Sequence, residues 1–188
     1  NPTGDFMDQA DFEKIAETGL PFVVDEAYIE FAGLTKSQSK LIKKYKNVMV
    51  TRTLSKAYGL AGLRFGYVLG NEEIISQISA TLLPWNVGVI SMWVALTALE
   101  DTDDLAVRVK YNNDQVKFFE DSLGDIPGLT IFHSYANYIL FDAGNAGKKG
   151  QDVMTYAQEK GLIFRPMNIM YGSEGFFRIT LGTEEENQ

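Results

Sequence analysis

Short apolar runs alternate with amphipathic stretches over the first hundred residues of the chain. Three runs are apolar on consecutive positions, as is typical of strands covered on both faces: residues 22–24, 47–50 and 65–69. The stretches around these runs have the spacing of helices: residues 12–16, 37–45, 72–83 and 90–100. Strands that alternate with helices in this way predict an α/β fold.

The pattern changes after the acidic stretch at residues 100–104. The long helix expected there presents one face at steps of three and four residues: Leu105, Val109, Asn112, Val116, Phe119 and Leu123. Short strands and one helix follow, with longer loops between them: strands at 129–132, 138–141, 162–164 and 177–181, and a helix at 152–160. Thr183 and Glu186 have the spacing of a capping box that opens a final helix. We therefore predict a larger domain at residues 1–103 and a smaller α+β C-terminal domain at residues 104–188.

Composition and charge exclude several classes of function. Hydrophobic residues make up 45% of the 188 residues and charged residues 22%, which indicates an ordered globular chain. No apolar run reaches the length of a membrane-spanning helix. The net charge of -8 disfavours nucleic-acid binding, because phosphate backbones are recognised by basic surfaces. Cysteine is absent and His133 is the single histidine, so thiolate zinc sites, histidine-rich metal sites and a cysteine nucleophile are excluded.

The first candidate for chemistry is Asp25, which stands where a predicted buried strand ends. Active sites of open α/β sheets gather at the carboxyl ends of strands, and Tyr28 follows three residues later. Two apolar residues followed by Asp25-Glu26 also resemble the magnesium-binding strand of a phosphate-loop ATPase. That alternative requires a G-x-x-x-x-G-K-[ST] loop, which this sequence lacks.

The second candidate is the segment after the predicted strand at residues 47–50. Lys56 lies there beside the hydroxyls of Thr53 and Ser55, and Arg64 follows eight residues later. A lysine in a partly desolvated crevice can act as a nucleophilic amine. Hydroxyls and an arginine together form a good phosphate cradle, because they offer several hydrogen-bond donors and a fork-shaped cation. A surface lysine and a structural arginine are the alternative interpretation of the same stretch.

Taken together and in order, these motifs resemble the fold type I, class I/II aminotransferases that use pyridoxal 5′-phosphate, and most of all the histidinol-phosphate aminotransferases. The resemblance covers nearly the whole chain. It is carried by Asn1-Pro2-Thr3-Gly4 and by five further stretches: residues 24–31, 52–56, 61–64, 84–87 and 178–183. It implies a large domain with a mainly parallel sheet between helices, followed by a small C-terminal domain.

The resemblance also implies a role for each candidate residue. Lys56 would be the catalytic residue that bonds to the cofactor aldehyde and then moves the proton, while Asp25 would pair with the ring nitrogen of the cofactor. The remaining cofactor contacts would come from Asn1 and Tyr28 at the ring oxygen and from Thr53, Ser55 and Arg64 at the phosphate. The substrate contacts would come from Arg165, Arg178 and Asn137, with the two arginines holding the anionic end.

For the whole protein, the resemblance implies a cytoplasmic homodimer that acts on a small anionic, phosphorylated substrate. The amino group would pass between glutamate or 2-oxoglutarate and histidinol phosphate or imidazole-acetol phosphate, as part of histidine biosynthesis. The family has further cofactor-binding segments before the motif that starts at Asn1, so we expect this chain to be N-terminally truncated. No metal, membrane or nucleic acid is expected.

Three alternatives remain open on the sequence. A lyase similar to threonine-phosphate decarboxylase shares much of the motif set. An aminotransferase of other amino acids, such as aromatic ones, would keep the cofactor residues and differ in substrate. A chain with an incomplete cofactor site could also be an inactive fragment that performs no catalysis on its own.

Overall fold

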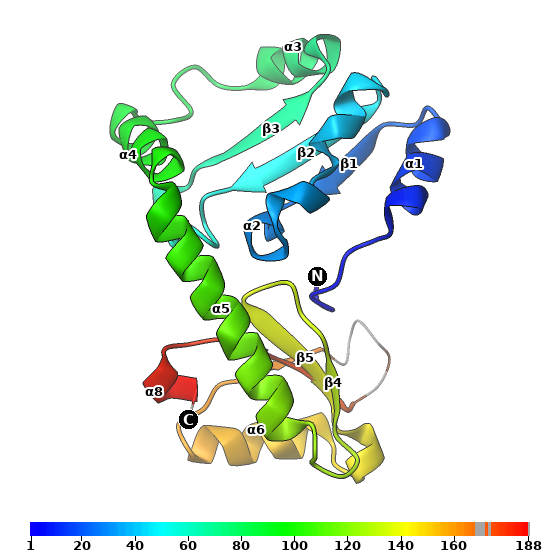
Figure 1. The fold of residues 1–188 in the computed structure, drawn as a ribbon, viewed down its shortest axis with the longest axis vertical. Coiled ribbons are helices and arrows are strands. Elements are labelled where there is room, and N and C mark those ends of the chain that lie inside the picture. The colour runs from blue at the N-terminus through cyan, green and yellow to red at the C-terminus, as the bar shows by residue number, and fades with distance from the viewer. Residues whose placement is uncertain (168–171, 173, 188) are drawn as a thin grey trace. The chain divides into compact units, whose positions relative to one another are not determined.

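The structure is a computed structural model that describes residues 1–167, 172 and 174–187. The chain folds into two compact units (Figure 1). One unit consists of residues 7–109, and the other combines residues 1–6 with residues 110–188. The long helix α5 (Thr102–Leu123) contributes residues to both units. The division into domains at residues 103 and 104 stays a prediction.

The unit of residues 7–109 is built around a three-stranded sheet in the order β1 (Phe22–Asp25), β2 (Val48–Thr53), β3 (Gly66–Gly70). β1 and β2 run parallel. The helical elements lie before, between and after the strands: α1 (Gln9–Glu17), α2 (Ile29–Ala32), η1 (Leu34–Lys36), η2 (Gln38–Lys43), η3 (Ala61–Leu63), α3 (Glu72–Thr81) and α4 (Val89–Glu100).

The structure confirms an α/β fold, but its described sheets are not mainly parallel. β3 runs antiparallel to β2, with Gly66 opposite Thr53. Parallel neighbours need a crossover that returns the chain to the starting edge, usually by a helix. Residues 54–65 contain only the short 310 helix η3, so the chain turns back at the edge where β2 ends. The consecutive apolar residues at 65–69 predicted a strand, but they carried no information on its direction relative to β2.

The core of this unit explains why the short apolar runs form strands. Val24, Val48 and Val50 pack with Ala16 of α1 and Leu41 of η2, and all five are buried. β-branched side chains suit a pleated surface, and burying an aliphatic side chain contributes roughly 1.5–3 kcal/mol. The burial of these residues holds β1 and β2 together and thereby fixes the edge at which both strands end.

One predicted helix has a different form. The stretch expected to be helical at residues 37–45 contains the 310 helix η2. The Ser37 hydroxyl caps η2 by accepting a hydrogen bond from the Ser39 amide over 3.1 Å. Serine side chains compete for backbone groups and weaken regular α-helix, which accounts for the tighter, shorter element.

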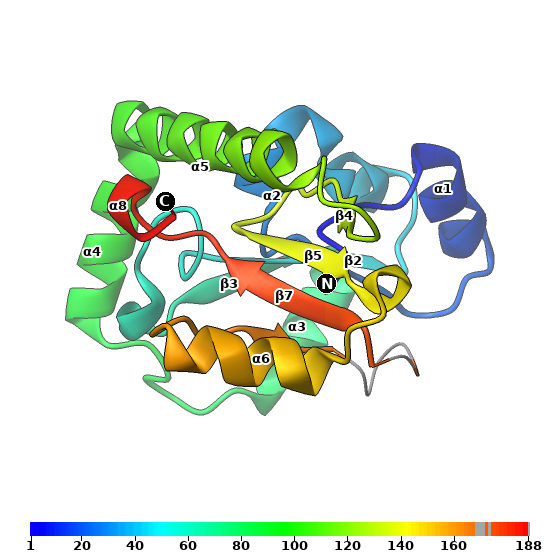
Figure 2. The same cartoon turned by 90° about the horizontal axis from the view of Figure 1, so that it is seen from below.

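The second unit has a four-stranded antiparallel sheet in the order β4 (Thr130–Phe132), β5 (Tyr138–Asp142), β7 (Phe176–Thr180), β6 (Arg165–Pro166). Phe141, Ala143 and Phe177 form its buried core, and Val153 and Met154 of α6 (Gly150–Glu159) pack on them. Figure 2 shows α6 lying along this sheet. The 310 helix η4 (Gly144–Ala146) connects β5 to the segment before α6.

The capping box predicted at the chain end is confirmed. The Thr183 amide donates to the Glu186 carboxylate over 2.8 Å, and the Glu186 amide donates to the Thr183 hydroxyl over 3.3 Å. These bonds open α8 (Glu184–Asn187). Within the described residues, no helix has the length and hydropathy needed to cross a membrane.

Candidate active site

The candidate residues of the first unit gather at one edge of its sheet. β1 ends at Asp25 and β2 ends at Thr53, and because the two strands are parallel, both ends lie at the same edge. β3 is antiparallel and begins at this edge with Gly66. The segment between β2 and β3 therefore brings Ser55, Lys56 and Arg64 to the edge as well. This arrangement is the one that open α/β sheets use for binding sites.

Asp25 and Lys56 are both available for a ligand at this edge. Asp25 is exposed, and its carboxylate accepts one hydrogen bond of 3.0 Å from the Ala27 amide. Lys56 is half-buried, and its Nζ lies 5.2 Å from the centre of the Tyr28 ring. In the described part of the chain, Lys56 forms no ion pair with a carboxylate. The lysine is thus held by an aromatic face that leaves its nitrogen free for chemistry.

The segment after β2 folds back on itself through its hydroxyls. Thr53 Oγ1 lies 2.9 Å from Ser55 Oγ and accepts a hydrogen bond of 3.1 Å from the Ser55 amide. Arg64 adopts a left-handed backbone conformation with φ of 53°, which non-glycine residues adopt rarely. Its exposed side chain donates to the Ala61 carbonyl over 2.9 Å. Hydroxyls and a guanidinium at one strand end form a set of donors suited to a phosphate.

The remaining predicted residues lie in the second unit. Arg165 of β6 and Arg178 of β7 are direct partners in the antiparallel sheet, so their side chains leave the same face. The Arg178 guanidinium lies 4.5 Å from the Tyr138 ring and donates to Asn1 Oδ1 over 3.2 Å. The Nε of Arg178 is buried without a hydrogen-bond partner among the described residues. Asn137 is half-buried, and its carbonyl accepts a hydrogen bond from the Leu181 amide over 3.0 Å.

Like charges on directly opposite residues of a sheet destabilise each other, and a nearby anion relieves this repulsion. In the part of the chain that the structure describes, neither Arg165 nor Arg178 forms an ion pair with a carboxylate. A doubly charged anion with several oxygens, such as a phosphate group, would neutralise both and supply acceptors for their N–H groups.

The structure therefore places the predicted residues in two sets, one in each unit. Asp25, Tyr28, Thr53, Ser55, Lys56 and Arg64 belong to residues 7–109, and Asn1, Asn137, Arg165 and Arg178 belong to the other unit. The first set offers an amine, a carboxylate and phosphate donors, whereas the second offers paired cations.

The sequence analysis missed a buried polar cluster beside the first set. Glu26 is 6% exposed and accepts hydrogen bonds from the Gln38 amide, the Ser37 hydroxyl and Arg52 Nε over 2.5, 3.0 and 3.0 Å. Arg52 Nη2 donates to the same Ser37 hydroxyl over 2.7 Å. The available signal was Arg52 itself, because an arginine that follows an apolar strand run must find an acidic partner if it is to be buried.

Glu30 adds a second carboxylate to this cluster. It is also 6% exposed, and its Oε2 has no hydrogen-bond partner among the described residues. Burial raises the pKa of the Glu30 carboxyl above its ordinary value of 4.5. Burial also raises the pKa of the nearby Tyr58, with the charge of Glu30 as a further cause. Because an unfolded chain releases the Glu30 proton more easily, this group lowers the stability of the fold as the pH rises above 4.5.

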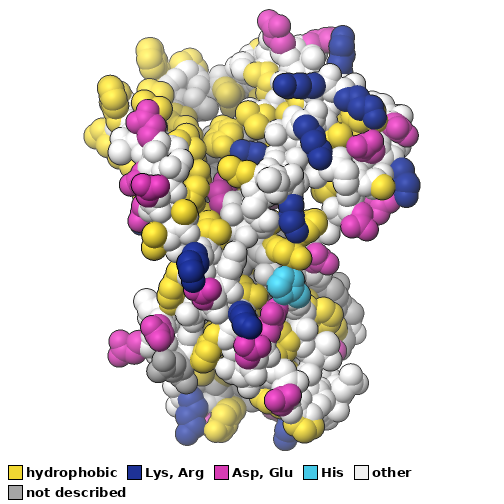
Figure 3. All heavy atoms as spheres, viewed as in Figure 1, with side chains coloured by type: hydrophobic (Ala, Val, Ile, Leu, Met, Phe, Trp, Pro, Cys, Tyr) yellow, Lys and Arg dark blue, Asp and Glu magenta, His cyan; other side chains and the backbone are white. Residues whose placement is uncertain are grey.

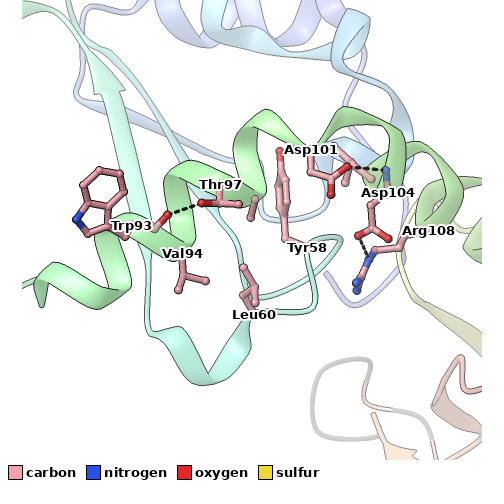
Figure 4. A pocket seen from close by; sticks show the side chains of 10 residues that line it. Tyr58, Leu60, Trp93, Val94, Thr97, Asp101, Asp104 and Arg108 are labelled. Atoms are coloured by element: carbon pink, nitrogen blue, oxygen red, sulfur yellow. Dashed lines mark hydrogen bonds and ion pairs between the residues drawn. The ribbon is translucent and has the colours of Figure 1, made fainter.

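A cavity of about 360 Å³ lies between the segment that follows Lys56 and the helices α4 and α5. Figure 4 shows Tyr58 rising from this segment toward the helices, with the ion pair of Arg108 and Asp104 at one end. The walls are mainly apolar, with Leu60 and Val94 among the lining residues. The lining contains none of the predicted cofactor residues, so the cavity is distinct from the edge that carries Asp25 and Lys56.

Comparison with known proteins adds to this geometry. The family model for aminotransferase class I and II matches residues 1–188. The chain is 38% identical over 188 residues to the histidinol-phosphate aminotransferase of Thermoanaerobacter sp. (strain X514), covering 100% of this chain and 52% of that protein.

Two solved structures are similar along the whole chain. One is the histidinol-phosphate aminotransferase from Clostridium acetobutylicum, with a TM-score of 0.92, 25% identity and 58% of that chain covered. The other is the histidinol-phosphate aminotransferase from Sinorhizobium meliloti in complex with pyridoxal-5′-phosphate, with a TM-score of 0.87, 25% identity and 52% covered. The chain thus spans about half the length of the relatives it matches. Because the family model matches every residue from 1 to 188, the chain belongs to the aminotransferase class I and II family.

Proposed function

We propose that this chain is part of an aminotransferase that uses pyridoxal 5′-phosphate and acts on histidinol phosphate. The amino group would pass between glutamate or 2-oxoglutarate and histidinol phosphate or imidazole-acetol phosphate, in histidine biosynthesis. The observation that carries the proposal is the sheet edge at which Asp25, Lys56 and a set of phosphate donors meet. The relatives from Thermoanaerobacter sp. and Clostridium acetobutylicum described above are both histidinol-phosphate aminotransferases, which supports the choice of substrate.

The residues at this edge fit the cofactor group by group. When bound, pyridoxal phosphate supplies an aldehyde that condenses with amines and a ring that accepts electrons. Lys56 offers the amine, and its ammonium has no competing carboxylate among the described residues. The exposed Asp25 carboxylate offers a negative charge for a ring nitrogen. Thr53, Ser55 and Arg64 offer the donors that a phosphate dianion requires.

The chemistry of the chain's own residues follows from these positions. Lys56, once its amine is free, takes a proton from the substrate carbon and returns one, acting as a general base and then as a general acid. Asp25 keeps a positive charge on the group it faces, because a carboxylate favours the protonated form of a nearby base. Tyr28 holds the Lys56 chain on its ring face, and we propose that Tyr28 and Asn1 donate to the ring oxygen.

The substrate phosphate would bind to the second unit. Arg165 and Arg178 leave one face of the sheet as neighbours, and Tyr138 stacks against Arg178 and restricts its guanidinium. We place Asn137, which precedes β5, at the same substrate site. A phosphorylated substrate suits this acidic protein only if local cations outweigh its net charge of -8.

The test of the proposal is covalent trapping at Lys56. Borohydride reduction of the protein with pyridoxal phosphate is expected to leave the cofactor attached to Lys56, where mass spectrometry of the peptides would locate it. Lys56→Arg keeps the charge and should abolish the label, while Lys46→Arg, an exposed lysine of the same unit, should not. Labelling of other lysines with Lys56 untouched would refute the assignment.

We further propose that the protein is a homodimer. Apolar side chains of α4 and of the segment before it remain exposed in this chain, including Leu83 at 78%, Trp85 at 94% and Ile90 at 75%. Figure 3 shows hydrophobic side chains gathered over the part of the surface where α4 lies. Exposed apolar patches of this kind mark association surfaces.

Sedimentation equilibrium is expected to give twice the mass of the chain. Ile90→Glu should shift the equilibrium toward the monomer because it places a charge in the patch. Leu34→Glu, which changes an exposed leucine of η1, serves as the matched control and should leave the mass unchanged. A stable monomer of the unchanged protein would reject the dimer.

Two finer features of the predicted fold belong to the same proposal. The three strands β1 to β3 would be part of a larger, mainly parallel sheet between helices, and the protein would act in the cytoplasm. The division into domains at residues 1–103 and 104–188 is part of the same proposal; the two compact units agree with two domains, but they divide after residue 109 and join residues 1–6 to the C-terminal unit.

A further inference from the structure

We propose that Glu26 is a positioning residue, which together with Arg52 and Ser37 fixes the strand ends that carry Asp25 and Lys56. The proposal rests on the proposed use of pyridoxal phosphate at this edge. It assigns Glu26 no contact with the cofactor. Glu26 would act through Asp25, its neighbour in the chain.

An ion pair connects the segment that carries Asp25 to the segment that carries Lys56. Glu26 follows Asp25, and Arg52 precedes Lys56 by four residues. Their ion pair, with Arg52 Nε and Glu26 Oε2 3.0 Å apart, therefore joins the segment that carries the carboxylate to the one that carries the amine. The backbone supports the same register, because the Glu26 amide donates to the Thr51 carbonyl over 2.9 Å.

This pair is better shielded than the other ion pairs among the described residues. The side chains of Arg52 and Glu26 are 15% and 4% exposed, whereas the other pairs involve side chains that are at least 30% exposed. Shielded charges interact strongly, and removing one partner leaves the other buried and unpaired. The pair can therefore hold a geometry that a surface ion pair could not.

Three further hydrogen bonds support the ion pair of Glu26 and Arg52. The Ser37 hydroxyl, at the start of η2, donates to Glu26 and accepts from Arg52. The Gln38 amide donates to the other Glu26 oxygen, Oε1. The end of β1, β2 and the start of η2 are thus all connected to one buried ion pair next to the candidate site.

Asp25 itself has little to hold it in place. The hydrogen bond that its carboxylate forms is to Ala27, two residues along the same segment. Successive residues of an extended chain point to opposite sides, so Glu26 can be buried while Asp25 faces solvent at the edge. The direction of the Asp25 side chain therefore depends on how firmly the adjacent Glu26 is held.

Glu30 provides a matched comparison for Glu26. Both are equally buried glutamates beside Arg52, but Glu30 has an unpartnered oxygen, and burial raises its pKa. In the described part of the chain, Arg52 donates a hydrogen bond to Glu26 and not to Glu30. Changing Glu30 to glutamine keeps the shape of a side chain that does not bond to Arg52, whereas the same change at Glu26 removes the charged partner of Arg52.

The experiment compares Glu26→Gln with Glu30→Gln in the protein titrated with pyridoxal phosphate. Dissociation constants come from cofactor fluorescence, and the pH midpoint of the absorption band reports the charge at the cofactor ring. Glu26→Gln is expected to weaken binding about tenfold, a typical loss when the support of a ligand-holding group is removed, and to shift the pH midpoint. Glu30→Gln should retain the affinity and midpoint of the unchanged protein.

Circular dichroism and thermal unfolding show whether each variant is folded. If Glu26→Gln is unfolded, the dissociation constant and the pH midpoint are measured in Arg52→Lys instead. This variant keeps the positive charge, but it cannot bond to Glu26 and Ser37 in the same fork geometry. Equal binding and an unchanged midpoint in the deciding variant would overturn the inference, as would equal losses in Glu30→Gln. If the unchanged protein causes no change in the absorption of pyridoxal phosphate, the proposed function itself is refuted.

Discussion

Replacing Asp25 with asparagine is expected to lower the rate of amino transfer by orders of magnitude while cofactor binding persists. The substitution keeps the shape of the side chain and can still accept the hydrogen bond from Ala27. It removes the negative charge that favours a protonated ring nitrogen, and the ring then accepts electrons less well. Single-turnover rates and cofactor titration, measured on the same samples, separate the two effects.

Asp103→Asn is the control for the Asp25 substitution. Asp103 is an exposed carboxylate in the first turn of α5, and no role at the sheet edge is proposed for it. Its loss changes the net charge by the same amount as the loss of Asp25. Near-normal transamination by Asp25→Asn would contradict the role of Asp25, and an equal loss in Asp103→Asn would point to a general effect of charge.

The positions of the main elements could be predicted from the sequence because the local signals are strong. The runs at residues 22–24 and 47–50 became β1 and β2, since valines at these positions bury into a common core. The capping box at Thr183 depends only on residues three apart and was equally readable. The direction of β3 could not be predicted, because it depends on how residues 54–65 turn in space.

In the candidate site, too, residues in continuous motifs could be predicted from the sequence, whereas contacts between distant segments could not. The residues at the sheet edge could be named from motifs, since each motif is a short continuous stretch. The cluster of Glu26, Ser37 and Arg52 joins segments up to 26 residues apart, and only the parallel pairing of β1 with β2 brings them together. The pairing of Arg165 with Arg178 likewise depends on strand register, which the sequence did not reveal.

Removing Arg178 tests whether Arg165 and Arg178 bind the phosphate of the substrate. Arg178→Ala is expected to lower kcat/KM for histidinol phosphate about tenfold or more, because a hydrogen bond between charged groups contributes roughly 1.5–3 kcal/mol and tenfold corresponds to about 1.4 kcal/mol. Unphosphorylated histidinol should be little affected, since it lacks the dianion. Arg108→Ala, which removes an exposed arginine paired with Asp104, is the matched control.

The same assay distinguishes the competing functions. Histidinol phosphate, threonine phosphate, phenylalanine and aspartate are compared under one condition, with carbon dioxide release measured for threonine phosphate. The two arginines at paired strand positions, Arg165 and Arg178, favour the two phosphorylated substrates, because a phosphate dianion can offset two cations. Faster turnover of phenylalanine or aspartate would refute the phosphate role of the pair and leave the cofactor chemistry standing. Carbon dioxide release from threonine phosphate would instead identify a decarboxylase that uses the same anion site.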